Sequence, residues 1–163
     1  MLSIMRIIVW KVVIAAAIAV AYGQPKPDFS GTWKLNPSQS NYTDPRVAVP
    51  DSLVWKLEHR RDHLLYIVEG IRQGKKNGFT ADINIGAEAF ESDEAGIITA
   101  RWQGVSLVVQ TLYNPGNERR ASMDEVWTLS EDGTTLTDSV VYHVLKNAKN
   151  QSDVIFKRVF DKQ

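Results

Sequence analysis

From Ser30 onward the sequence is a series of short segments in which apolar and polar residues alternate. Turn residues separate these segments, and none of them holds the 3.6-residue period of an amphipathic helix over ten or more residues. This pattern is typical of an all-β sandwich or barrel. We expect strands over 30–35, 52–59, 63–71, 79–85, 97–103, 105–113, 121–129, 134–145 and 152–161, with a short one near 88–92.

Most connections between these segments are short and carry residues suited to hairpins. Asn77-Gly78, 114–117 (Asn-Pro-Gly-Asn) and Asp132-Gly133 supply positive-φ or proline-fixed positions. Segment 36–51 holds three prolines and is expected to be an extended loop. Strands that follow one another should pair as a meander, and only closure of the sheet removes its two exposed edges. We therefore predict an antiparallel up-and-down β-barrel of about 8–10 strands.

The first 23 residues have the pattern of a signal peptide. Arg6 and Lys11 precede the uncharged apolar run 12–21, and Ala21 and Gly23 are small residues two apart. We predict a signal helix over 1–23 that is cleaved after Gly23. The protein would then be exported, periplasmic or secreted.

A retained membrane anchor is the alternative interpretation of this segment. A spanning helix needs roughly 20 apolar residues, whereas Lys11 interrupts the run and Pro25 ends it. We expect no stable membrane insertion after cleavage, and a single domain over 24–163.

The amino-acid composition excludes several kinds of site and partner. The chain has no cysteine, which excludes disulfides, thiolate-bound metals and a lipoprotein anchor. Without Arg6 and Lys11 it has 17 basic and 19 acidic residues, a formal charge of −2. Such a balance offers no electrostatic reason to bind nucleic acid. We expect a monomer.

Turn geometry fixes which residues share a face, because side chains alternate along a strand. A turn centred on Asp132-Gly133 pairs Trp127 with Asp138 and places Glu125 and Tyr142 on the same face. A symmetric loop over 146–151 then places Arg158 opposite Asp138. The Gln103-Gly104 hairpin groups another set of residues on one face: Ile98, Ala100, Trp102, Val105, Leu107 and Val109.

The predicted inner face therefore carries three charges, those of Glu125, Asp138 and Arg158. An unpaired charge inside a barrel is costly, so Arg158 requires a partner, and Asp138 is the nearest. One interpretation is a buried structural ion pair beneath Trp33. The other is a ligand site in the barrel interior. Its candidate residues are Arg158, Tyr142, Glu125, Asp138, Trp127 and Trp102.

The sequence gives little support for a catalytic site or a metal site. His59 and His63 flank the tight turn 60–62, which predicts a solvated hairpin tip rather than a metal site. No Gly-x-Ser-x-Gly or comparable nucleophile setting is present. We expect no metal, no cofactor and no enzyme activity.

The opening segment 28–35 (DFSGTWKL) resembles the Gly-x-Trp first strand of the calycins, the lipocalins and fatty-acid-binding proteins. It is most similar to the small exported lipocalin-like proteins of bacteria. Segment 156–160 (FKRVF) is similar to the last barrel strand of fatty-acid-binding proteins, where tyrosine follows the arginine by two residues. The resemblance implies that Gly31 and Trp33 close one end of the barrel against a basic residue of the last strand, which we assign to Arg158.

Two features depart from fatty-acid-binding proteins. Those proteins insert a helical lid after the first strand, whereas this chain has the proline-rich segment 36–51. Their clamp tyrosine is replaced here by Phe160.

The resemblance implies a lipocalin-like barrel that binds a small apolar or amphipathic molecule in its interior. A barrel with a filled core that acts as a protein-interaction or envelope-associated module is the first alternative. A calycin-type enzyme acting on a lipophilic substrate is the second.

Overall fold

The structure is a computed structural model that describes residues 25–93, 95–113, 121–146 and 150–163. The predicted signal peptide lies outside these residues. Ten strands follow one another along the chain: β1 (Gly31–Leu35), β2 (Ser52–Arg60), β3 (His63–Arg72), β4 (Lys75–Asn84), β5 (Phe90–Ser92), β6 (Gly96–Gln103), β7 (Ser106–Tyr113), β8 (Ala121–Leu129), β9 (Thr135–Lys146) and β10 (Asn150–Lys162).

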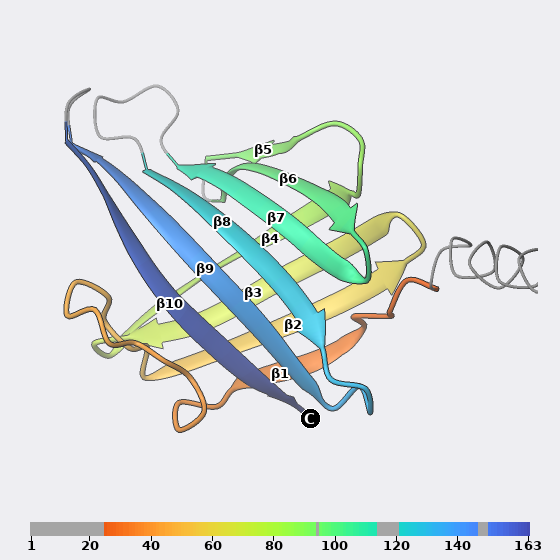
Figure 1. The fold of residues 1–163 in the computed structure, drawn as a ribbon, viewed down its shortest axis with the longest axis horizontal. Helices are drawn as coiled ribbons and strands as arrows, with labels where there is room; N and C mark the ends of the chain where they lie inside the picture. Colours follow the sequence, from red (N-terminus) through yellow and green to blue (C-terminus); the bar gives the residue numbers. More distant parts are fainter. Residues whose placement is uncertain (1–24, 94, 114–120, 147–149) are drawn as a thin grey trace, which may run out of the picture.

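All ten strands belong to one antiparallel sheet in the order β4-β3-β2-β1-β10-β9-β8-β7-β6-β5. The first and last strands pair with each other, so the meander curls into a barrel (Figure 1). The edge strands β4 and β5 lie next to each other without a hydrogen-bonded ladder, which leaves the barrel nearly closed. The predicted all-β up-and-down barrel is confirmed. No helix among the described residues is long and apolar enough to cross a membrane.

The strand pairs follow the predicted registers on β8, β9 and β10. Trp127 pairs with Asp138 and Glu125 with Val140, and Asp138 pairs with Arg158. The turn between β8 and β9 therefore sets the faces as its sequence indicates. The β6–β7 hairpin also has the predicted parity, except that Val105 lies in the turn itself and is 42% exposed.

The β3–β4 turn differs from the prediction. It is formed by Gln73 and Gly74, with φ angles of 51° and 73°, which suit a two-residue hairpin loop. Gly78, predicted to lie in this turn, is instead inside β4. A Cβ there would come within 2.2 Å of the backbone oxygen of Val68. This glycine permits close approach of two strands rather than a reversal of the chain.

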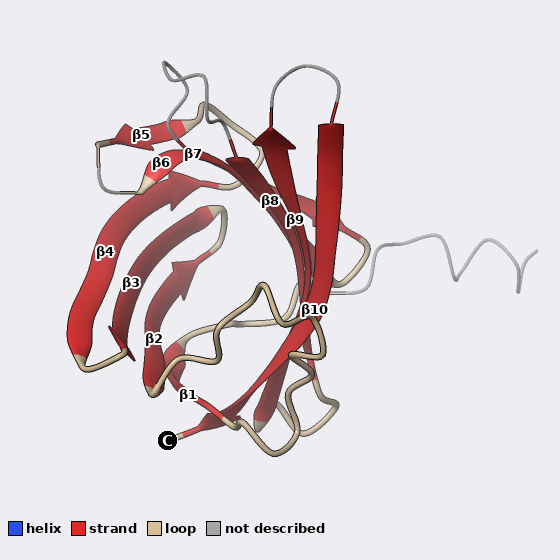
Figure 2. Ribbon diagram, turned by 90° about the vertical axis from the view of Figure 1, so that its left-hand side faces the viewer, coloured by secondary structure: helices blue, strands red, loops and turns tan. Residues whose placement is uncertain are grey.

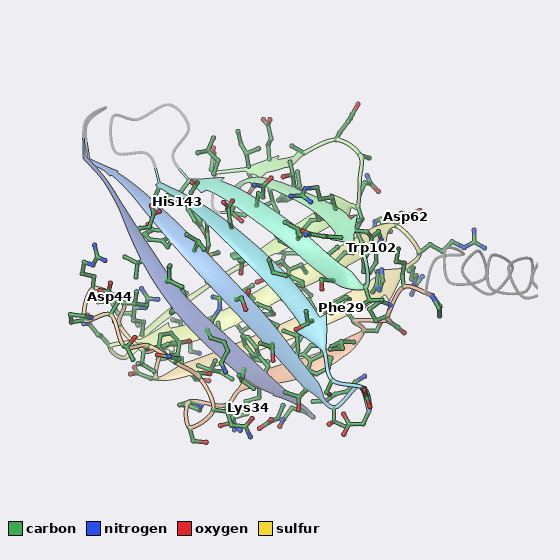
Figure 3. The ribbon with its side chains drawn as sticks, in the orientation of Figure 1. Phe29, Lys34, Asp44, Asp62, Trp102 and His143 are labelled. Carbon is green, nitrogen blue, oxygen red and sulfur yellow. The ribbon has the colours of Figure 1, made fainter. Side chains whose placement is uncertain are left out.

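One half of the barrel is filled by aromatic side chains. Trp33, Trp55, Trp127, Phe29 and Phe160 are all fully buried. The Trp55 ring lies 4.2 Å from that of Phe160 and 4.8 Å from that of Trp127, measured between centroids. Each such side chain removes roughly 150–250 Å² from water, so this cluster is the main apolar core. Figure 3 shows Phe29 at this end of the molecule, near Trp102.

The residues that close this end differ from the prediction in one respect. Lys162, not Arg158, lies over the Trp33 ring, with its Nζ 5.2 Å from the ring centroid. Trp33 and Lys162 are partners in the β1–β10 ladder. Arg158 lies four residues before Lys162 on β10, and its Cζ is 5.0 Å from the Trp55 ring centroid. Gly31 provides the room, because a Cβ there would be 2.7 Å from Lys162 Cε.

Candidate ligand cavity

A cavity of about 690 Å³ occupies the other end of the barrel. Ligand pockets in proteins typically enclose about 300–1,000 Å³, so its size suits one small molecule. Its lining combines nine residues without polar side chains and seven with them: Tyr42, Arg46, Val47, Ala48, Pro50, Leu53, Val68, Gly70, Arg72, Asn77, Tyr113, Met123, Tyr142, Val154, Phe156 and Arg158. Asp44, on the loop that borders the cavity, marks this end in Figure 3, opposite Phe29 and Trp102.

The loop 36–51 forms one wall of the cavity. Asn41 and Lys157 exchange two backbone hydrogen bonds of 2.8 and 3.0 Å, which pin the loop to β10. The Tyr42 ring stacks on Phe156, with 5.6 Å between the ring centroids. Figure 2 shows the loop running across the front of the barrel, from β1 past β10 to β2. The segment is non-helical, as its prolines predict, but it contains turns at 37–39 and 45–46 and is therefore not extended throughout.

Arg158 lies at the floor of the cavity with two carboxylates beneath it. Its Nε donates to Asp138 Oδ2 at 2.6 Å, and its Nη2 lies 2.5 Å from the same oxygen. Nη2 also donates to Glu125 Oε1. The side chains of Glu125 and Asp138 are only 1% and 0% exposed, whereas that of Arg158 is 13% exposed. The arginine therefore separates both carboxyl groups from the cavity.

Burial makes it costly for both carboxyl groups to be charged at once. Desolvation, followed by the negative charge of Asp138, raises the pKa of Glu125 to about 8, although Arg158 opposes the shift. Desolvation also raises the pKa of Asp138, again against the effect of Arg158. Asp138 Oδ1 is buried without a donor from any described residue, and a proton held by Glu125 supplies one. Near pH 7 the three groups then form a unit with no net charge.

Three tyrosines add hydrogen-bonding groups to the wall. The hydroxyl of Tyr42 is buried and has no hydrogen-bond partner among the described residues. Desolvation raises the pKa of Tyr42, and desolvation together with the Glu125 charge raises that of Tyr113. Tyr142 lies beside Tyr113, with 6.4 Å between the ring centroids. Tyr42 and Tyr113 are therefore neutral phenols that can donate and accept hydrogen bonds.

The mouth of the cavity carries two more arginines. Arg46 is held by Asp44, its Nη2 lying 2.5 Å from Asp44 Oδ2, and it also donates to the backbone oxygen of Asp153 at 3.1 Å. Arg72 is exposed at the end of β3. Positive charge at this end is thus concentrated near solvent.

The structure brings four of the six predicted site residues together. Arg158 and Tyr142 line the cavity, and Glu125 and Asp138 lie directly beneath Arg158. Trp127 is fully buried in the aromatic core. Trp102 lies at the filled end of the barrel, 6.1 Å from the Phe29 ring. Strand parity predicts the face of a residue but not its depth along the barrel axis, so it does not distinguish these two tryptophans from residues that line the cavity.

Several lining residues escaped the sequence reasoning. Tyr113 and Arg72 share the parity of inner-facing Val109 and Tyr66, so extending the alternation to the strand ends would have found them. Tyr42 lies in the proline-rich loop, where no periodicity indicates which side chains point inward. Only its tertiary contact with Phe156 places it.

His59 is a structural residue, contrary to the predicted solvated hairpin tip. Its side chain is 6% exposed, Nδ1 accepts from the Phe29 amide at 3.3 Å, and Nε2 lies 2.8 Å from Arg61 O. The short leader before β1 folds over it, which the strand pattern does not reveal. His63 is half-exposed and lies beside Asp82. Among the described residues, no group of three or more His, Asp or Glu side chains could hold a metal ion.

Comparison with known proteins gives a fold but no family. No protein-family model matches the sequence, and no curated protein matches it significantly. Among solved structures, the apo form of lipid binding protein 8 from Caenorhabditis elegans is similar, with a TM-score of 0.52 and 16% sequence identity. The match covers 88% of this chain and 100% of that one. At this identity the likeness supports the barrel fold alone.

Proposed function

We propose that this chain is an exported, lipocalin-like protein that binds a small apolar or amphipathic molecule inside its barrel. The observation that carries the proposal is the 690 Å³ cavity, which opens to solvent at one end and is lined by nine residues without polar side chains and seven with them. This combination is typical of sites for small amphipathic ligands. A barrel with a completely filled core would leave no such space, and here only one half is packed solid.

Export rests on the sequence. The charged and apolar segments of residues 1–23 favour a cleaved signal peptide, which would leave 24–163 as the mature, monomeric domain. The name of the similar solved structure, a lipid binding protein, agrees with an apolar ligand.

The enzyme alternative has less support. Glu125 and Asp138 are the two most deeply buried carboxyl groups described, and both are sealed behind Arg158. A general acid or base must reach its substrate within hydrogen-bonding distance. The interaction-module alternative would use the outer surface and leave the cavity without a role.

The test uses Nile red, a neutral dye that fluoresces in apolar surroundings, with the protein purified after expression of the full chain. Met123→Trp would fill part of the cavity and should weaken dye binding at least tenfold. Val126→Trp, on the outer face of the same strand, is the matched control and should leave binding unchanged. Absence of dye binding, or equal effects of the two variants, would overturn the proposal. The intact mass of the same preparation reports whether residues 1–23 are removed.

A further inference from the structure

We propose that the cavity selects an amphiphile whose buried end is an uncharged hydrogen-bonding group, such as an alcohol, and discriminates against the matching carboxylate. This inference rests on the proposed function and concerns the same site. It names the class of ligand that the cavity floor accepts.

The first argument is the charge balance at the floor. Arg158 is the cation that lies deepest in the cavity, and its Nε and Nη2 are already used by Asp138 and Glu125. Because Glu125 holds a proton near pH 7 and Asp138 already neutralises Arg158, a carboxylate ligand placed there would bring a second negative charge to one guanidinium. Because the surroundings are desolvated, repulsion between like charges is weakly screened. A neutral ligand group meets no such repulsion.

The second argument is the kind of hydrogen-bonding partner that the wall presents. The buried Tyr42 hydroxyl has no partner among the described residues, and Tyr113 and Tyr142 lie on the wall beside it. A phenol both donates and accepts a hydrogen bond, as does an alcohol, whereas a carboxylate only accepts. A buried polar group gains most from a partner that satisfies it without bringing a charge.

The third argument is the identity of residue 160. The last strand places Phe160 two residues after Arg158, and its ring is fully buried against Trp55. It therefore contributes no hydroxyl beside the arginine, and it does not line the cavity. The floor thus offers an anion neither a free Nε or Nη2 of Arg158 nor a hydroxyl from residue 160.

The experiment measures displacement of Nile red by 1-decanol and by decanoate, which have the same chain length and differ in the head group. At pH 7.5 the wild-type protein should bind decanol at least tenfold more tightly. Replacing both acids, Glu125→Gln with Asp138→Asn, frees Arg158 and should improve decanoate binding at least tenfold while decanol changes less than threefold. Glu69→Gln, an exposed carboxylate paired with Lys56, is the control and should change neither.

The double variant leaves a buried arginine unpaired and can fail to fold. The triple variant Glu125→Gln, Asp138→Asn, Arg158→Met removes all three charges. It should still prefer decanol, because it offers no cation to decanoate. Equal binding of decanol and decanoate by the wild-type protein overturns this inference and leaves the proposed function standing. An Arg72→Gln variant that loses decanoate alone would then place the head group at the mouth. Failure of Nile red and both amphiphiles to bind overturns the proposed function itself.

Discussion

The two ends of this barrel are built from the same strands but filled in opposite ways. At one end the inner face carries Trp33, Trp127 and Phe29, which are fully buried against one another. At the other end it carries smaller or more polar residues, such as Gly70 and Val154, and a cavity of about 690 Å³ remains. A repeated inward-outward alternation therefore determines the barrel, whereas side-chain volume along its axis determines where the barrel is hollow.

The charged unit of Arg158, Glu125 and Asp138 marks the boundary between the two ends. Arg158 lies over Trp55, a member of the aromatic core, and over Phe156, a member of the cavity wall. Since the acids are sealed and the arginine reaches the cavity, the unit acts as the floor of the hollow half. Three predictions test this division.

The largest effect is expected from removing the cation at the boundary. Arg158→Met leaves two carboxyl groups buried without their partner, which typically costs about 3–5 kcal/mol. We expect urea denaturation to show a loss of this size in the free energy of unfolding. The triple replacement with Glu125→Gln and Asp138→Asn should recover most of it. A loss below ~1 kcal/mol for Arg158→Met would show that the unit does not hold the boundary.

The second prediction compares one substitution at the two ends. Leu136→Ala, at the filled end, removes a fully buried side chain. It should lower the free energy of unfolding by about 3 kcal/mol, because buried apolar surface is lost and a cavity is left behind. Leu53 lines the cavity and is only partly buried where it packs against the core. Leu53→Ala should therefore cost about 1 kcal/mol. Equal costs in thermal or urea unfolding would contradict the distinction between the ends.

The third prediction concerns pH and again involves the boundary. The pKa of Glu125 is raised in the folded protein from 4.5 to about 8, so the folded state keeps a proton that the unfolded chain releases. The stability from this group is fully present below pH 4.5 and is lost as the pH rises toward 8. We expect the free energy of unfolding to fall by ~1 kcal/mol per pH unit between pH 5.5 and 7.5.

Glu125→Gln should remove most of this slope. The raised pKa of His143, held by Asp153 and Asp124 on the outer face, acts in the same direction. A His143→Gln variant measures its share. A wild-type slope of zero, or one that Glu125→Gln leaves intact, would show that the carboxyl groups do not share a proton.

Local geometry explains why so much of the site was predictable. The turn around Asp132-Gly133 directly connects β8 and β9, and counting outward from it places Trp127 opposite Asp138. The same counting brings Arg158 opposite Asp138. Register across a hairpin is fixed by its loop, so these contacts follow from residue positions alone.

Contacts without a connecting turn were not predictable in this way. β1 and β10 lie at opposite ends of the chain, so no loop length fixes their register, and Lys162 rather than Arg158 was found over Trp33.

The position of the β3–β4 turn was also not predictable from its local sequence. The Asn77-Gly78 pair is a strong turn signal, yet the reversal occurs at Gln73-Gly74. Pairing along the whole of β3 and β4 outweighs the local preference of two residues.

The strands, their order as a meander and the shared face of Glu125, Asp138 and Arg158 follow from the sequence alone, because alternation and short turns are local properties. The positions of Trp102 and Trp127 away from the cavity, and of Tyr42 on its wall, depend on the tertiary structure. Depth along a barrel axis depends on strand tilt and closure, and the inward side of a proline-rich loop depends on what it packs against. The alternation of residues along a strand predicts neither the depth of a side chain in the barrel nor the inward side of a loop.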